Sequence, residues 1–135
     1  MTPTLLITGA AGSVGSALRP LLRRHYTLRL LDRHPIAETV ENEHAIACDL
    51  TDRNAVLAAV AGADAIVHLA CAHGPAIRYD ETVEPNYHAT LYLLEAAQRH
   101  AVSRFVFASS HHVLGQYRGD EVERFDDLPA APDSY

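Results

Sequence analysis

Short apolar runs alternate along this chain with segments in which apolar residues recur at three- and four-residue spacing. Runs of β-branched and aliphatic residues that end at glycine or polar residues indicate strands buried on both faces. We expect five strands, at residues 4–8, 28–31, 45–48, 65–69 and 104–109. The segments between them have the periodicity of amphipathic helices.

Three helices are expected between these strands. The first begins at Ser13 after a glycine-rich turn, and Pro20 inside it removes one backbone hydrogen bond and should produce a kink. The second follows Thr51 as its N-cap and ends before Gly62. The third closes near His100. One face of it is traced by Tyr87, Leu91, Leu94 and Ala101.

The alternation of strands and helices predicts a parallel sheet that is covered by helices on both faces. The expected fold class is therefore α/β, a Rossmann-type doubly wound parallel sheet. The chain has 135 residues, of which 48% are hydrophobic and 21% charged, which is the composition of a soluble globular protein. One domain over residues 1–135 is expected.

The charge balance argues against nucleic acid as a partner. There are 17 acidic residues against 11 Lys and Arg, a net charge of −6, without a basic stripe that would neutralise phosphates. No apolar run approaches the length of a membrane span, and the first residues lack the pattern of a secretory signal, so we expect a cytoplasmic location. Cys48 and Cys71, in or just after apolar segments, are expected to be reduced, buried thiols.

The first strand runs into a turn in which three glycines are spaced three residues apart. Gly9 permits a tight turn, Gly12 lets the backbone approach a pyrophosphate, and Gly15 lets the helix pack closely on the strand. The pyrophosphate would lie at the helix N-terminus, where N–H groups and the helix dipole favour anions. The expected cofactor loop also contains Ala11, Ser13 and Val14. Packing alone is the alternative reason for glycines in such a turn.

Asp32 ends the second strand, at the position where a carboxylate hydrogen-bonds the hydroxyls of an adenosine ribose. A carboxylate there repels a 2′-phosphate, so NAD is favoured over NADP, although the adjacent Arg33 offers a phosphate partner. The alternative role of Asp32 is to start a turn. Asp49 ends the third strand, where it either reaches the adenine amino group or caps the following helix.

Several motifs of the chain together resemble the extended short-chain dehydrogenase/reductase family, the NAD-dependent epimerases and dehydratases. The motifs are the turn at 8–15, Asp32, Asp49-Leu50, His68-Leu69-Ala70, Asn86 and the segment 107–110. The resemblance covers the entire chain, and segments 107–115 and 129–135 look most like the uronate dehydrogenase branch. It implies NAD as cofactor and cofactor-binding roles for Leu50, Leu69, Ala70 and Asn86, with Leu69 and Ala70 along the nicotinamide side.

The resemblance also implies a catalytic serine and tyrosine. Ser110 matches the serine that hydrogen-bonds the reacting substrate oxygen; its alternative role is a polar strand terminus. In the family a tyrosine accepts the alcohol proton and a lysine four residues later lowers its pKa. No Tyr-x-x-x-Lys occurs in this sequence, and Tyr135 is either the catalytic tyrosine or the residue before it.

Three histidines have two different interpretations. His111 and His112 are expected to contact the substrate, and not a metal, because neighbouring residues at a strand end point to opposite sides. His68 lies within an apolar strand and is expected to be a satisfied core residue.

The predicted function is that of an NAD-dependent oxidoreductase acting on a sugar or sugar acid, with uronate oxidation as the finer hypothesis. The alternatives are a nucleotide-sugar epimerase or dehydratase that uses NAD, and a non-catalytic NAD-binding module. The resemblance implies a complete protein of about twice this length. The chain is therefore expected to be the N-terminal, five-stranded portion of a larger domain, inactive by itself and with its fifth strand as an exposed edge. A homodimer is expected only for the full-length form.

Overall fold

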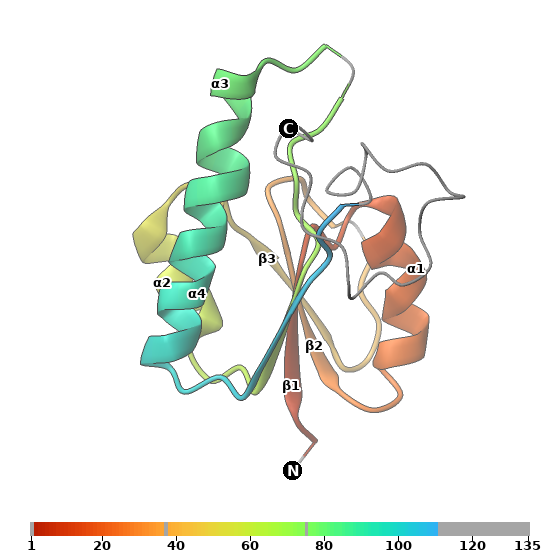
Figure 1. Cartoon of the computed structure of the whole chain (residues 1–135). Helices are drawn as coiled ribbons and strands as arrows, with labels where there is room; N and C mark the ends of the chain where they lie inside the picture. The colour runs from red at the N-terminus through yellow and green to blue at the C-terminus, as the bar shows by residue number, and fades with distance from the viewer. Residues whose placement is uncertain (1, 37, 75, 111–135) are drawn as a thin grey trace, which may run out of the picture.

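The computed structural model describes residues 2–36, 38–74 and 76–110. Its centre is a sheet of five parallel strands in the order β3-β2-β1-β4-β5 (Figure 1). The strands are β1 (Thr4–Thr8), β2 (Thr27–Asp32), β3 (Glu43–Ala47), β4 (Ala65–His68) and β5 (Arg104–Phe107). Each predicted apolar run contributes a strand, and the predicted α/β class is confirmed.

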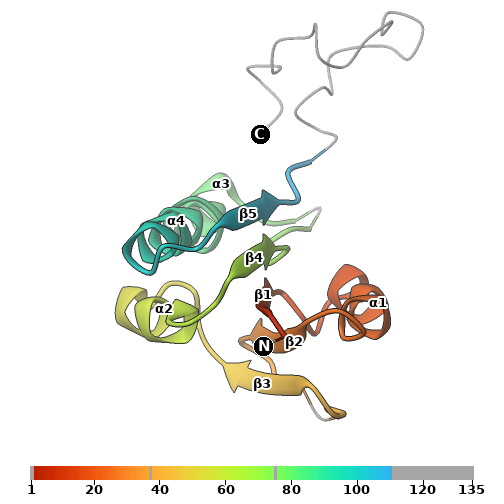
Figure 2. The same ribbon diagram turned by 90° about the horizontal axis from the view of Figure 1, so that it is seen from below.

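Helices cover both faces of the sheet (Figure 2). The helix α1 (Ser13–Leu22) lies on one face, and α2 (Arg53–Val60) and α4 (Ala89–Arg99) pack together on the other. A short helix, α3 (Tyr79–Thr82), and a π-helical segment, η1 (Val83–His88), lead directly into α4. None of the helices in the described ranges combines the length and the apolar character that a bilayer crossing requires.

The sheet is buried between two apolar cores. Under α2 and α4 the core contains Leu6, Leu31, Val56, Ile66 and Leu93. Under α1 it contains Leu5, Ile7, Leu28 and Leu30. Successive side chains of a strand point to opposite faces, so a strand that is covered on both faces has apolar residues at every position. This is why the first strand shows an unbroken apolar run in the sequence.

The face that α4 buries differs from the one traced in the sequence. Tyr87, Leu91 and Leu94 are 62%, 44% and 45% exposed. The residues of α4 that pack inward are Ala89, Leu93, Ala96 and Ala97. Apolar residues occur on more than one side of this helix, and the side with small alanines permits close approach to α2 and to the sheet.

Two other local predictions require correction. The third strand begins and ends earlier than expected, at Glu43–Ala47, with Cys48 just beyond it. The N-cap of α2 is Asp52 and not Thr51, because Asp52 Oδ1 accepts hydrogen bonds from the backbone N–H groups of Asn54 and Ala55, both at 3.0 Å. Both are shifts of one or two residues at the ends of elements, where patterns are least informative.

The two cysteines are free thiols, as predicted, but only one is buried. Cys48 lies in the core beside α2, whereas Cys71 is exposed and the prediction of a buried thiol there is wrong. The fifth strand forms an edge of the described sheet, and Val106 and Phe107 on it are largely exposed, which confirms the expected apolar edge. Pro20 lies in the last turn of α1.

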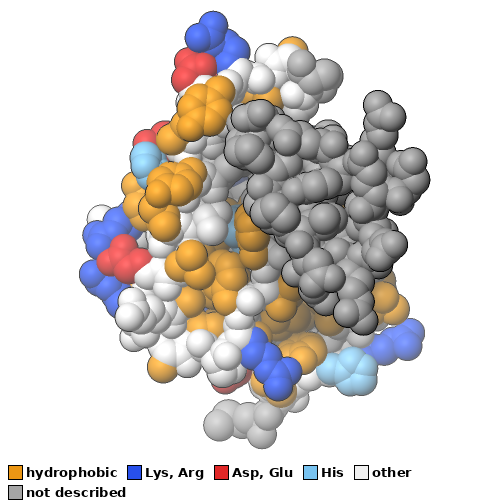
Figure 3. Space-filling view, viewed as in Figure 1, with side chains coloured by type: hydrophobic (Ala, Val, Ile, Leu, Met, Phe, Trp, Pro, Cys, Tyr) orange, Lys and Arg blue, Asp and Glu red, His pale blue; other side chains and the backbone are white. Residues whose placement is uncertain are grey.

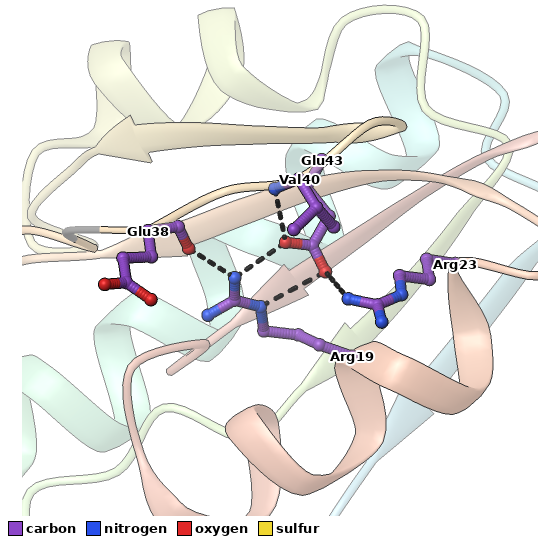
Figure 4. Close-up of polar contacts among 5 residues, drawn as sticks. All are labelled: Arg19, Arg23, Glu38, Val40 and Glu43. Carbon is purple, nitrogen blue, oxygen red and sulfur yellow. Dashed lines mark hydrogen bonds and ion pairs between the residues drawn. The ribbon is translucent and has the colours of Figure 1, made fainter.

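A buried ion pair joins α1 to the amino end of β3 (Figure 4). Glu43 Oε2 accepts from Arg19 Nη2 at 2.6 Å, and Arg23 Nη1 lies 3.8 Å from Oε1. The same Arg19 nitrogen donates to the Glu38 carbonyl at 2.7 Å, and the Val40 N–H donates to Glu43 at 3.4 Å. The hydrogen bond from Arg19 holds the pKa of the Glu43 carboxyl below its usual value, although burial opposes this. The cluster joins α1, β3 and the segment between β2 and β3.

Candidate functional site

A cavity of about 510 Å³ opens at the carboxyl ends of the strands. The chain proceeds from β1 to β2 and β3 on one side, while β4 lies on the other side of β1. Such a reversal of winding leaves a crevice where ligands of doubly wound folds bind. Residues from the segments after β1, β2, β3 and β4 line the cavity: Gly9, Ala11, Gly12, Leu31, Asp32, Arg33, His34, Cys48, Asp49, Leu50, Thr51, Leu69, Ala70, Cys71, Ala72, His73, Ile77 and Pro85.

The three glycines of the turn have separable structural reasons. Gly9 has a φ of +69°, and a Cβ there would lie 2.7 Å from the Ala70 nitrogen at the end of β4. A Cβ on Gly15 would lie 2.6 Å from the Gly9 carbonyl oxygen, because α1 packs directly on the turn. Gly12 meets only the Gly9 oxygen, at 3.2 Å, and it lines the cavity. The packing explanation therefore accounts for Gly9 and Gly15, whereas at Gly12 the contact is tight but milder, and Gly12 also borders the cavity.

Gly12 is also the N-cap of α1. As a glycine it has no side chain to accept hydrogen bonds from the first N–H groups of the helix, and the first turn contains no acidic residue. The helix terminus at the cavity is thus suited to an anion, by its N–H groups and by the helix dipole.

Asp32 connects the glycine turn to the end of β2. Its Oδ2 accepts the Ala11 N–H at 3.0 Å, and its Oδ1 accepts the His34 N–H at 2.9 Å. The His34 ring nitrogen Nδ1 is 3.3 Å from the same Oδ1. The side chain is only 10% exposed and borders the cavity. Asp32 therefore starts a turn, the alternative considered from sequence, and also presents a carboxylate to the cavity.

Asp49 is used in a turn and does not cap α2. Its Oδ1 accepts from both the backbone N–H and the hydroxyl of Thr51, each at 2.9 Å. These hydrogen bonds lower the pKa of the Asp49 carboxyl, and the charge of Arg33 adds to the effect. Asp32 and Asp49 together place two carboxylates on the β2 and β3 side of the cavity.

Most of the predicted cofactor residues come together at this cavity. Those that line it are Gly9, Ala11, Gly12, Asp32, Arg33, Asp49, Leu50, Leu69 and Ala70. Ser13, Val14 and Gly15 form the first turn of α1 beside it. Ser110 is the last described residue and follows β5. The remaining predicted residues, His111, His112 and Tyr135, lie outside the described residues.

Asn86 lies in η1 and acts on the cavity wall through the backbone. Its Oδ1 accepts the Ala72 N–H at 2.7 Å and its Nδ2 donates to the Ala72 carbonyl at 2.9 Å. Ala72 itself lines the cavity, and it was missed by the sequence reasoning, as were Cys48, Thr51 and Ile77. For Cys48, Thr51 and Ala72 a usable signal was their position within a few residues of a strand end, since the carboxyl ends of parallel strands meet at one end of the sheet, whereas Ile77 lies further along the chain, just before α3.

His68 is the satisfied core residue that the sequence predicts. It is 1% exposed at the end of β4. Its Nδ1 lies 2.6 Å from Thr8 Oγ1, and its Nε2 lies 3.0 Å from Thr90 Oγ1. Burial lowers the pKa of the His68 ring to about 4, so the ring is neutral at physiological pH.

The doubly wound sheet, the glycine turn at the reversal of winding and the carboxylate at the end of β2 define a Rossmann-type domain of the class that binds dinucleotides. Within that class, the chain belongs to the NAD dependent epimerase/dehydratase family, whose model matches residues 5–135. The family resemblance expected from the motifs is confirmed.

Several relatives of the chain are sugar or sugar-acid dehydrogenases by name. The chain is 42% identical to a uronate dehydrogenase of Pseudomonas putida, covering 97% of this chain and 49% of that protein. It is 35% identical to an NAD-dependent glucose-6-phosphate dehydrogenase of Haloferax volcanii, covering 95% and 50%. The chain thus spans about half the length of the curated relatives it matches.

Solved structures agree with this relationship. A crystal structure of uronate dehydrogenase from Agrobacterium tumefaciens has a TM-score of 0.87 and 41% identity, covering 97% of this chain and 49% of that one. A mutant of the Agrobacterium tumefaciens enzyme, with the same TM-score and coverage, was solved in complex with NAD.

Proposed function

We propose that this chain is the NAD-binding portion of an oxidoreductase that acts on a sugar or a sugar acid. The observation that carries the proposal is the cavity at the carboxyl ends of the strands, with the glycine turn in its middle and Asp32 on one side. The names of the relatives, uronate dehydrogenase and glucose-6-phosphate dehydrogenase, support the same reaction class. They favour net oxidation over epimerisation or dehydration.

The residues around the cavity fit NAD. Asp32 would hydrogen-bond the adenosine ribose, and its charge, next to that of Asp49, disfavours a 2′-phosphate. Gly12 and the N-terminus of α1 would hold the pyrophosphate. The second nucleotide half then extends past β1 toward Leu69 and Ala70, with Asn86 supporting that wall through Ala72. When bound, NAD supplies the hydride acceptor.

The substrate side of the proposal follows the strand order. β5 lies next to β4, so Ser110 after β5 belongs to the side that we assign to nicotinamide. Ser110 would hydrogen-bond the oxygen of the reacting carbon, and Tyr135, or the residue after it, would accept the proton. His111 and His112 would contact the sugar acid. A hexuronate is the proposed substrate, and absence of turnover of any hexuronate by the full-length protein would exclude it.

An exposed apolar surface on α3, η1 and α4 supports a homodimer of the full-length protein. Tyr79, Tyr87, Leu91 and Leu94 are exposed there, and Figure 3 shows hydrophobic side chains gathered over these helices. Apolar patches of this kind mark interaction surfaces in soluble proteins. We propose that a second copy of the chain covers this surface. We also propose that nucleic acid is not a partner and that the protein is cytoplasmic.

The test of the cofactor assignment is titration calorimetry of the chain with NAD and with NADP. Asp32→Asn keeps the size of the side chain and removes its charge, so it should weaken NAD binding and narrow the preference over NADP. Asp80→Asn is the matched control, because it removes one carboxylate from the exposed pair with Arg78, outside the cavity. Equal NAD affinity of Asp32→Asn and wild type would contradict the assignment.

A further inference from the structure

A buried polar network connects β1 and β4 to α4 behind the cavity wall. His68 contacts Thr8 through Nδ1, at 2.6 Å, and Thr90 through Nε2, at 3.0 Å. Thr8 is fully buried at the end of β1, and Thr90 lies in the first turn of α4. The rings of Phe105 and Phe107 flank the imidazole, with centroids at 6.2 and 5.6 Å. A polar side chain buried in an apolar core destabilises the fold unless its hydrogen bonds are satisfied.

The contacts fix the direction of every hydrogen bond in this network. The Thr90 hydroxyl donates to the Asn86 carbonyl at 2.5 Å, so it has no second hydrogen and accepts from His68 Nε2. The neutral ring then carries its one proton on Nε2, and the bare Nδ1 accepts from the Thr8 hydroxyl. Thr8 Oγ1 in turn accepts the Ala70 N–H at 3.3 Å. The lowered pKa of His68 agrees with a neutral ring.

Both ends of the network hold the same stretch of cavity wall. One end is the Ala70 N–H, and the other is Asn86, whose side chain forms two hydrogen bonds with the backbone of Ala72. Ala70 and Ala72 line the cavity on the β4 side, opposite Asp32. If the adenosine lies at Asp32, the nicotinamide half lies along this stretch.

We propose that His68, with Thr8 and Thr90, is a positioning residue that fixes the segment 69–72 and thereby the nicotinamide side of the site. This rests on the proposed NAD function. Neither His68 nor Thr90 lines the cavity, so their effect passes through backbone positions. Loss of the Thr90 hydroxyl should loosen the segment 69–72 and leave the adenosine side, built from Asp32 and the glycine turn, unchanged.

The test compares Thr90→Val, which has the same shape without a hydroxyl, with Thr90→Ser, which keeps the hydroxyl. NAD and ADP-ribose, which lacks nicotinamide, are titrated against each folded variant by calorimetry. We expect Thr90→Val to weaken NAD about three- to tenfold more than ADP-ribose, the equivalent of one net hydrogen bond, and Thr90→Ser to restore the wild-type ratio. Equal weakening of both ligands would overturn the proposal.

Two NMR measurements on the chain without ligand test the proposal independently. Nitrogen-15 correlation spectra should place the His68 proton on Nε2, with the resonance identified by its loss in His68→Gln; a proton on Nδ1 would overturn the network. Amide exchange at Ala70 and Ala72 should accelerate in Thr90→Val and not in Thr90→Ser. If wild type binds neither NAD nor ADP-ribose, the proposed function and the nicotinamide assignment fail, while amide exchange still decides whether the network holds the segment.

Discussion

The ion pair between Arg19 and Glu43 should contribute strongly to stability, and Arg19→Met is the change that tests it. The Glu43 side chain is fully buried and that of Arg19 is 17% exposed. Arg19→Met keeps an unbranched apolar stem and removes the 2.6 Å hydrogen bond to Glu43 and the 2.7 Å bond to the Glu38 carbonyl. The buried carboxylate keeps only Arg23, at 3.8 Å, and the Val40 N–H.

Removing one partner of a buried pair destabilises proteins by about 3–5 kcal/mol. Because Arg23 remains and the pair lies near the sheet edge, we expect the lower end, about 3 kcal/mol. Urea unfolding at neutral pH measures this as a lower midpoint with an unchanged slope. Arg24→Met removes an exposed arginine just after α1 and serves as control, with an expected change below about 0.5 kcal/mol.

The effect of Arg19→Met should also depend on pH. The pKa of Glu43 is lowered in the folded protein, so the stability it contributes is present above the titration range of an unfolded glutamate and is lost as the pH falls through its folded pKa. The variant leaves a buried carboxylate that protonation relieves, so the difference from wild type should shrink toward about pH 4. A variant as stable as wild type at neutral pH, or a difference independent of pH, would refute this reasoning.

Three further predictions concern the turn, a helix cap and the apolar surface. Gly15→Ala places a Cβ 2.6 Å from the Gly9 oxygen and should lose about 1–3 kcal/mol in urea unfolding, whereas Gly12→Ala should lose less stability but weaken NAD in calorimetry; the opposite ranking would contradict the separation of their roles. Asp52→Ala should destabilise the chain by about 1 kcal/mol, since it removes the N-cap of α2, and an unchanged urea midpoint would argue against the cap. Leu91→Lys should lower the dimer fraction of the full-length protein in light scattering, and an unchanged fraction would exclude this surface.

The fold was predictable because its signals are local. Unbroken apolar runs such as the one at β1 identify strands covered on both faces, and their alternation with helices restricts the sheet to a parallel one. The glycine turn and Asp32 were predictable for the same reason, since each follows its strand directly. The boundary shift at α2 arose where two capping residues are adjacent, Thr51 and Asp52, and the shift at β3 arose because the strand begins at the polar residues Glu43 and His44, before the apolar run.

The rest depended on contacts between distant segments. The buried side of α4 could not be chosen from periodicity, because Leu91 and Leu94 are as apolar as Leu93, and only the packing against α2 selects the side. The sequence predicted that the hydrogen bonds of His68 are satisfied, but not by which residues, since its partners Thr8 and Thr90 are 60 and 22 residues away in sequence. The resemblance pointed to Asn86, but its pairing with Ala72 is visible only in the structure.

The polar contacts at the amino end of β3 differ in kind from those at the carboxyl end of β4. At the amino end of β3, the charged side chains of Glu43 and Arg19 join α1 to the sheet, and neither residue lines the cavity. At the carboxyl end of β4, neutral hydrogen bonds through His68 and Thr90 end on backbone groups of the cavity wall. The charged residues Asp32, Arg33 and Asp49 lie on the β2 and β3 side of the cavity, whereas the neutral network fixes the β4 side of the wall without adding charge to it. Substitutions of Arg19 or Glu43 should therefore change stability and leave the ratio of NAD to ADP-ribose affinity constant, whereas Thr90→Val should change that ratio.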